Sequence, residues 1–185
     1  DTEIERLKNV TNYDDTEIRN ALNSKANSSD IPTKTSQLTN DSGFLTEHQD
    51  CWKEWYFEEE NLLKKTLSCL DRISHIGSTA IPTIWAKPII DILVEIPRES
   101  NLYDYKDLII NNGYICMSQS ENGLSFNKGY TENGYAERVF HLHLRYVGDN
   151  NELYFRDYLI EQPDVAKEYE ELKLRLWKKY EHNRD

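Results

Sequence analysis

The sequence predicts a mixed α+β domain, with helices packed on a mixed sheet and a small helical and extended appendage before it. Two segments indicate strands: residues 87–96 are almost continuously apolar, and residues 137–147 alternate apolar and polar side chains. Segments with helical periodicity lie on either side of them, at 52–70 and 152–185. A mixed order of helices and strands, with one helical layer packed on a sheet, indicates the α+β class.

Each element of this domain follows from a local pattern. Residues 52–70 place aromatic and leucine side chains on one side of a helix, and Gly113 ends a helix that begins at residue 102. Pro97 stops the apolar strand, and Pro163 fits the first turn of the last helix, where no backbone N–H is needed. The expected order is helix 52–70, strand 72–76, a turn and short helix at 77–85, strand 87–96, helix 102–113, strands 114–119, 123–130 and 137–147, and helices 152–162 and 163–185.

Composition changes near residue 50, which divides the chain into a segment at 1–50 and a domain at 51–185. The first segment holds two short helix candidates, and neither has enough apolar surface to be stable alone. A run of turn-forming residues follows them. We expect such a segment to order only against a partner chain or the following domain.

The net charge and the distribution of apolar residues argue against two classes of function, general nucleic-acid binding and membrane association. The net charge is −11 and the isoelectric point about 4.9, whereas general nucleic-acid binders present a basic surface, so we expect no general nucleic-acid binding. A local positive pocket can still bind a nucleotide. No apolar run approaches the roughly 20 residues that span a bilayer, and no signal peptide is visible, so no membrane association is expected. Three cysteines without metal-binding spacing fit free thiols in a reducing compartment, which predicts a cytoplasmic location.

Five motifs in residues 51–185 resemble the GrpB family: HIGSTAIP, AKPIIDILVEI, HLHLRYV, FRDYL and YEELKLRLWKKY, in that order. The family is regarded as a branch of the nucleotidyltransferase superfamily. The resemblance therefore implies a nucleotidyltransferase-like fold, while the family's reaction is poorly defined. The family pattern runs on past residue 185, so we expect this chain to stop slightly early.

The stretch IPTKTSQLTNDSGFLTEHQD is similar to linker or adaptor segments of bacteriophage tail fibre and baseplate proteins, and the likeness covers about residues 14–50. It implies that residues 1–50 form a stalk or linker, through which the chain can assemble as a homotrimer. For a phage-encoded chain, the location would then be virion-associated.

Gly77 and Ser78 follow the predicted strand 72–76, and a helix is expected from Thr79 onward. In nucleotidyltransferases such a Gly-Ser turn opens a helix whose N-terminal N–H groups bind phosphate, so the resemblance implies that Gly77 and Ser78 cradle a phosphate. The alternative is that the pair only makes a turn and caps the helix.

Asp91 stands within the apolar strand 87–96, where a buried carboxylate is costly unless it is paired or metal-bound. Two-metal phosphoryl transfer needs a second carboxylate two residues on, but Leu93 occupies that position. Glu95 faces the same side, about 13 Å further along the strand, which is too far to share an ion. The expected metal site is therefore incomplete, and Asp91 is alternatively a structural acid paired with Lys87, Arg138 or a histidine.

His141 and His143 lie two residues apart on a predicted strand, so both side chains point to one face, about 6.6 Å apart. If strand 72–76 and this strand flank Asp91, then His75, Asp91, His141 and His143 surround one pocket. Asp91, His75 and His143 are the candidate ligands of a divalent metal ion such as Mg²⁺, Mn²⁺ or Zn²⁺. Alternatively, the histidines form a polar seam or bind phosphate when protonated.

The leading hypothesis is a GrpB-like domain that binds a nucleotide or another phosphate-bearing ligand, with Gly77, Ser78, Lys87 and Arg138 as phosphate contacts. If it is an enzyme, nucleotidyl or phosphoryl transfer is expected, with Asp91, His141 and His143 as catalytic residues. The alternatives are a virion-associated structural or adaptor protein that carries a non-catalytic GrpB-like domain, and a pure interaction domain.

Overall fold

The computed structural model describes residues 45–132 and 134–179. The two helix candidates before residue 45, and the predicted stalk up to that point, lie outside the described residues. In the described part the helices are α3 (Cys51–Thr66), α4 (Leu102–Asn111), α5 (Asn151–Glu161) and α6 (Pro163–Lys179), with a short 3₁₀ turn η3 (Ser78–Ala80); the strands are β1 (Arg72–Ile76), β2 (Ile89–Ile96), β3 (Ile115–Ser120), β4 (Gly123–Thr131) and β5 (Gly134–Tyr146). This order agrees with the predicted one.

The five strands form one mixed sheet in the order β1-β2-β5-β4-β3. Strands β2 and β5 run parallel, and the other neighbouring pairs are antiparallel. In this register Asp91 lies opposite Ile76 on β1 and opposite His141 on β5. The predicted α+β class is therefore confirmed, and the central strand pair brings Asp91 next to His141.

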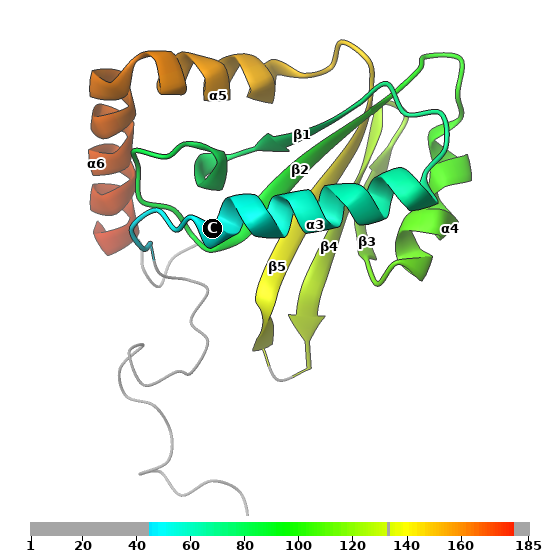
Figure 1. The fold of residues 1–185 in the computed structure, drawn as a ribbon, viewed down its shortest axis with the longest axis horizontal. Helices are drawn as coiled ribbons and strands as arrows, with labels where there is room; N and C mark the ends of the chain where they lie inside the picture. Colours follow the sequence, from blue (N-terminus) through cyan, green and yellow to red (C-terminus); the bar gives the residue numbers. More distant parts are fainter. Residues whose placement is uncertain (1–44, 133, 180–185) are drawn as a thin grey trace, which may run out of the picture. The chain divides into compact units, whose positions relative to one another are not determined.

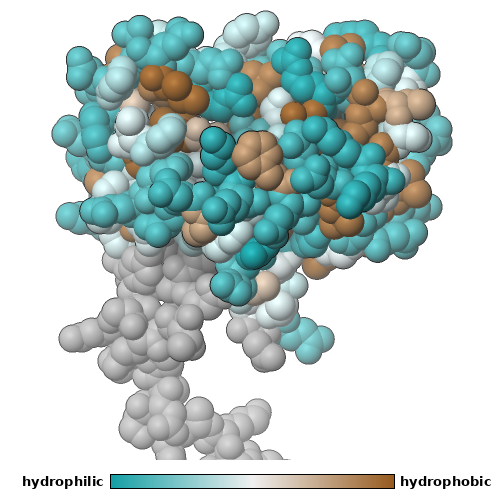
Figure 2. Space-filling model, in the orientation of Figure 1, coloured by the Kyte–Doolittle hydropathy of each residue, from teal (hydrophilic) through white to brown (hydrophobic). Residues whose placement is uncertain are grey.

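One face of the sheet packs against α3, which runs across the strands (Figure 1). The helix turns Trp52, Tyr56 and Leu63 inward, where they are buried with Ile92 and Leu142 of the central strands. The outward side of α3 is charged, and this view of the surface is mostly hydrophilic with scattered apolar patches (Figure 2). The amphipathic pattern of residues 52–70 therefore marks a helix that covers the sheet.

The C-terminal helices α5 and α6 lie at the end of the domain opposite α4 (Figure 1). On the sheet face away from α3, Leu153 of α5 is buried against Ile76 and Leu93. A second small cluster joins Ile81 and Ile84 to Leu159 of α5 and Ala166 of α6. These helices cover the later part of β2 and leave its beginning, around Asp91, partly open.

None of the helices in the described part is both long and apolar enough to cross a membrane.

Candidate functional site

Asp91 lies near the start of β2, and its side chain is 28% exposed. The expectation that it is the buried acid of this strand is wrong, because Glu95 takes that place with a side chain that is 1% exposed. Glu95 accepts hydrogen bonds from Asn150 Nδ2 at 2.8 Å and from the Gly148 N–H at 3.2 Å, and so ties the β5–α5 loop to the sheet. Asp91 instead faces a cleft, where a carboxylate can meet a ligand.

Gly77 makes the turn after β1 with a φ of 70° and a ψ of −174°, a conformation open essentially to glycine. A Cβ atom at this position would overlap Asp91 Oδ2. Glycine is therefore needed here so that the turn can pass close to the Asp91 carboxylate. The helix expected from Thr79 is only the three-residue turn η3 (Ser78–Ala80), so a helix N-terminus is not available to bind an anion.

His141 is held at both ring nitrogens. Its Nδ1 lies 3.3 Å from Asp91 Oδ1, and its Nε2 lies 2.9 Å from the Tyr130 hydroxyl. A carboxylate 3.3 Å from Nδ1 favours a proton on that nitrogen, which leaves Nε2 to accept from the Tyr130 hydroxyl. Asp91 thereby fixes the tautomer that leaves the lone pair on Nε2.

His143 lies two residues further along β5, on the same face as His141, and lines a cavity together with Asp91. Burial lowers the pKa of His143, with Asp91 acting in the opposite direction and Arg145 and His141 adding to the decrease. His143 is therefore neutral at neutral pH, where it can donate or accept a hydrogen bond but adds no positive charge for a phosphate.

His75 does not join this group. Ile76 pairs with Asp91 and shares its face of the sheet, so the preceding His75 points to the α3 side. There it stacks on Tyr56 with ring centroids 4.8 Å apart and contacts the Thr79 hydroxyl at 3.0 Å. Burial lowers the pKa of His75 to about 4, against the opposing effect of Asp91. The structure thus separates His75 from the other predicted metal ligands.

Two lysines and a serine line a cavity of about 310 Å³ that also includes Asp91 and His141. Lys87 precedes β2, and Lys173 reaches the cavity from α6, where its Nζ donates to Ser78 Oγ at 2.8 Å and to the Trp85 carbonyl at 3.0 Å. The sequence analysis did not single out Lys173, because one lysine among the many charged residues of the last helix carries no local signal. Its position becomes evident only when α6 packs beside the Ser78 turn.

A second cavity, of about 540 Å³, shares Ser78 and Asp91 with the first. Its walls include Ile81 and the aromatic pair Phe155 and Tyr169, whose rings meet edge to face at 5.4 Å. The two cavities therefore offer a charged compartment and a larger, more apolar compartment that meet at the same two polar residues.

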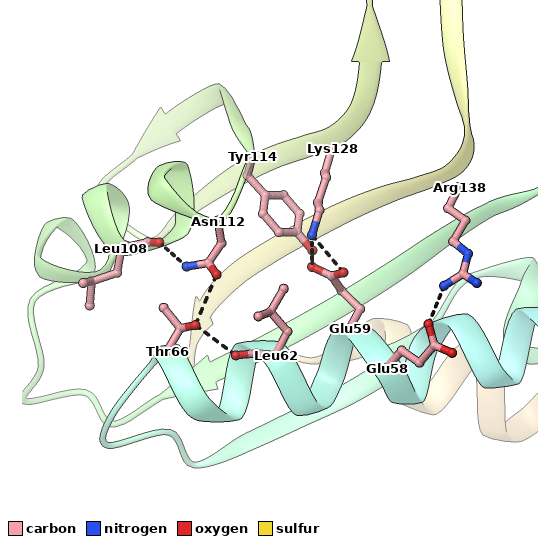
Figure 3. A network of polar contacts seen from close by, with 9 residues as sticks. All are labelled: Glu58, Glu59, Leu62, Thr66, Leu108, Asn112, Tyr114, Lys128 and Arg138. Carbon is pink, nitrogen blue, oxygen red and sulfur yellow. Dashed lines mark hydrogen bonds and ion pairs between the residues drawn. The ribbon is translucent and has the colours of Figure 1, made fainter.

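Arg138 lies away from the cleft, because it alternates with Val139 along β5 and points toward α3. It forms an ion pair with Glu58 (Figure 3). Its guanidinium group also packs over the ring of Trp55, 5.4 Å from the ring centroid. Of the four predicted phosphate contacts, the structure thus brings together Gly77, Ser78 and Lys87, and leaves Arg138 on the other face.

The site does not fit a two-metal centre. Leu93, at the position of the second carboxylate, is fully buried against Ile76 and Leu153. Both nitrogens of His141 are engaged, by Asp91 and by Tyr130, so His141 would have to give up one of these contacts to bind an ion. Among the residues that the structure describes, no group of three or more His, Cys, Asp or Glu side chains has the geometry to hold a metal ion. We therefore derive no chemistry through a bound metal.

Comparison with known proteins gives the family. The family model described as "GrpB protein" matches residues 44–185. The chain belongs to the GrpB family. The solved structure of the conserved protein GrpB from Enterococcus faecalis is 30% identical, with a TM-score of 0.66, and the match covers 77% of this chain and 87% of that one.

Two curated proteins are also similar in sequence to this chain. UPF0157 protein YqkA of Bacillus subtilis is 36% identical over 133 residues, which are 70% of this chain and 38% of that protein, so the match spans well under half of YqkA. Glutamate-rich protein GrpB of Alkalihalophilus pseudofirmus is 35% identical over 142 residues, which are 74% of this chain and 82% of that protein. These descriptions name a family and no reaction.

A weaker likeness relates 62% of this chain to 39% of a chain of the Cid1 poly(U) polymerase, with 13% identity and a TM-score of 0.43. A likeness this low carries no argument about function. The GrpB match begins at residue 44, so most of the phage tail-like segment lies outside it and outside the described residues. The stalk and the homotrimer through residues 1–50 stay predictions.

Proposed function

We propose that this GrpB domain binds a phosphate-bearing ligand, with a nucleotide as the favoured class, in the cleft between the Ser78 turn and β5. The phosphate group would lie among Ser78, Lys87 and Lys173. The observation that carries the proposal is that two lysines from distant parts of the chain, Lys87 and Lys173, line one cavity with the Ser78 hydroxyl.

The electrostatics of Lys173 favour an anion in this cavity. The pKa of Lys173 is lowered to about 8, mainly by burial and also by the charge of Lys87, while Glu170 and Asp91 act in the opposite direction. A desolvated ammonium group beside a second lysine gains more from a nearby anion than an ammonium group in water does. A phosphate bound here would therefore stabilise the charged form of Lys173.

The adjacent cavity supports a ligand larger than phosphate. Its volume of about 540 Å³ lies within the range of small-molecule pockets, and its walls are largely apolar with a few polar groups. The rings of Phe155 and Tyr169 offer surfaces on which a planar group such as a nucleobase can pack. A nucleotide would thus place its phosphates by the lysines and its base by the aromatic pair.

Calorimetric and thermal-shift titrations test this proposal, with inorganic pyrophosphate and the four ribonucleoside triphosphates as probes, each with and without Mg²⁺, Mn²⁺ or Zn²⁺. A ligand that binds the folded state at a hundred times its Kd stabilises that state by about 2.7 kcal/mol, so a clear rise in Tm is expected. The double variant K87M/K173M should lose this response.

Arg138→Met is the matched control, because it removes a cation from the opposite face of the sheet and should keep the response. Two results would overturn the proposal: no probe raises the Tm of the wild-type protein, or K87M/K173M responds as the wild type does. The first result would favour a domain that acts by contacting another protein.

A further inference from the structure

Tyr130, His141 and Asp91 form a continuous chain of polar contacts. The Tyr130 hydroxyl lies 2.9 Å from His141 Nε2, and His141 Nδ1 lies 3.3 Å from Asp91 Oδ1. A hydroxyl on an imidazole that a carboxylate orients is the arrangement by which enzymes activate an oxygen nucleophile. Tyr130 was not singled out by the sequence, because nothing in its local pattern distinguishes it from other strand tyrosines.

An irregularity in the pairing of β4 with β5 aims Tyr130 at His141. Asn127 pairs with His141 and Lys128 pairs with Phe140, but the register shifts between Lys128 and Tyr130. In a regular strand, Tyr130 would share the α3 side with Lys128. The two steps from Lys128 to Tyr130 oppose five steps from Phe140 to Tyr135, so the extra residues of this bulge belong to β5. Gly129, with a φ of 91°, lies opposite the bulge and turns the chain so that Tyr130 reaches His141 on the other face. A Cβ atom on Gly129 would overlap the Arg138 carbonyl, so the bulge requires glycine.

Two members of this polar chain, Asp91 and His141, line the proposed phosphate site. His141 lines the same cavity as Ser78, Lys87 and Lys173, so the base and the cationic groups face one ligand volume. The side chains of His141 and Asp91 are 26% and 28% exposed, which leaves both open to this cavity.

We propose that the Tyr130 hydroxyl is a nucleophile that accepts a phosphoryl or nucleotidyl group from a nucleoside triphosphate bound in the cleft. His141 is the general base, and Asp91 is a positioning residue that fixes its tautomer. This inference rests on the proposed function, since it needs the triphosphate to bind among Lys87 and Lys173.

The step balances as a single displacement. The Tyr130 oxygen attacks a phosphorus atom of the triphosphate and forms a new P–O bond, while its proton moves to His141 Nε2. The P–O bond to the leaving group breaks, and its electron pair leaves with pyrophosphate or with the nucleoside diphosphate. Asp91 stabilises the imidazolium that forms, and Lys87 and Lys173 offset the negative charge of the leaving group.

Intact-protein and peptide mass spectrometry of the full chain tests the inference, after incubation with each of the four ribonucleoside triphosphates and Mg²⁺. We expect a phosphoryl or nucleotidyl adduct on Tyr130 in the wild-type protein and none in Y130F. H141Q should form the adduct at least about a hundredfold more slowly, as expected when a general base is lost. D91N should slow it comparably, because an amide that donates to Nδ1 selects the tautomer without a lone pair on Nε2.

The controls separate this inference from the binding proposal. Y135F and R138M should form the adduct at the wild-type rate, since Tyr135 contacts Tyr130 by its ring edge and Arg138 lies on the other face. Calorimetry should show that Y130F binds the triphosphate as the wild type does. Binding without an adduct, an adduct that persists in Y130F, or an unchanged rate in H141Q would overturn the inference and leave the binding proposal standing. Loss of binding in the wild type would overturn both.

A measurement without turnover tests the same geometry. In ¹⁵N-labelled histidine spectra, the neutral form of His141 should be protonated at Nδ1, and D91N should shift this form toward protonation at Nε2. An Nε2-protonated ring in the wild-type protein would contradict the role of the Tyr130 hydroxyl as the group that His141 deprotonates.

Discussion

Two polar clusters lie on opposite faces of the same sheet, and their lysines have different hydrogen-bond partners. On the α3 side, Lys128 Nζ contacts both oxygens of Glu59 at 2.7 and 2.9 Å, and the Tyr114 hydroxyl donates to Glu59 at 2.9 Å (Figure 3). In the cleft, Lys173 instead hydrogen-bonds to neutral oxygens, the Ser78 hydroxyl and the Trp85 carbonyl. Lys128 on the α3 side is paired with a carboxylate, whereas the hydrogen bonds of Lys173 in the cleft go to uncharged oxygens.

The comparison explains why a cation alone does not mark a phosphate site. Arg138 is exposed and lines a cavity of about 480 Å³, yet that cavity also holds the carboxylates of Glu58 and Glu59. The smaller cavity at the Ser78 turn has two lysines and one carboxylate, Asp91. The balance of charge, and not the size of the cavity, indicates which face suits an anion.

The largest expected effect comes from breaking the internally matched cluster. Glu59→Leu leaves Lys128 and the Tyr114 hydroxyl without their acceptor, so the free energy of unfolding should fall by about 3 kcal/mol, the lower end for a buried pair because Lys128 is 24% exposed. Urea titration measures this change. Glu58→Gln is the control, since Glu58 is 64% exposed and its loss should cost less than about 1 kcal/mol.

The double variant E59L/K128L sharpens this result. Replacing both partners removes the uncompensated charge, so it should recover much of the stability lost in E59L. Pyrophosphate binding should stay unchanged in both variants, because this cluster lies on the α3 side. A stability loss below about 1 kcal/mol in E59L would contradict a matched buried pair.

A second prediction concerns acid sensitivity on the α3 side. The pKa of His75 is about 4 in the folded protein and 6.5 in its ordinary state, so the unfolded chain binds a proton that the folded chain does not. This contribution to stability is complete above pH 6.5 and is lost as the pH falls from 6.5 toward 4. The loss should be about 2 to 3 kcal/mol, since each pKa unit corresponds to about 1.4 kcal/mol.

Urea titrations of the wild type and H75Q across this pH range measure the effect. The variant should lose less stability on acidification than the wild type, although it is less stable at neutral pH because it lacks the stacking on Tyr56. Identical pH dependence in the two proteins would show that His75 is not held neutral by the fold.

A third prediction tests the turn that brings Gly77 close to Asp91. Gly77→Ala should lower the free energy of unfolding by about 2 kcal/mol, through the positive φ and the overlap with Asp91. It should also weaken pyrophosphate binding, because Ser78 and Asp91 must shift. Gly113→Ala is the matched control, since Gly113 also has a positive φ but a Cβ there would meet only Lys128 Cε at 3.9 Å. An equal loss of unfolding free energy in the two variants would show that the close approach to Asp91 adds nothing to the cost of the positive φ.

The smallest effect expected is on the affinity of the cleft. Because the pKa of Lys173 is about 8, its positive charge is lost as the pH rises through 8, and pyrophosphate should bind more weakly above that pH. K173M should weaken binding about tenfold at neutral pH, which is about 1.4 kcal/mol, and should flatten the alkaline decrease. Calorimetry across pH 7 to 9.5 measures the affinity at neutral pH and its decrease at alkaline pH. If K173M shows the same alkaline decrease as the wild type, then a group other than Lys173 causes the decrease.

The order of elements was predictable because each strand and helix carries its own periodicity. The alternation in 137–147 correctly placed His141 and His143 on one face of the sheet. The same alternation could have excluded Arg138 as a phosphate contact, because it lies an odd number of residues from both histidines and so points to the other face. The strand pairing was not predictable: His75 lies on the α3 side because the antiparallel register sets Ile76, and not His75, against Asp91. Residues that reach the cleft through tertiary packing, such as Lys173, have no local signal.

The most direct test of the central claim is a two-dimensional amide NMR titration of the full chain with pyrophosphate. Saturable shifts should appear at Ser78, Asp91 and Lys173, while Glu59 and Lys128 on the α3 side stay unchanged. Shifts that centre on Glu59 and Lys128, or no saturable shifts at all, would contradict the assignment of the anion site to the cleft.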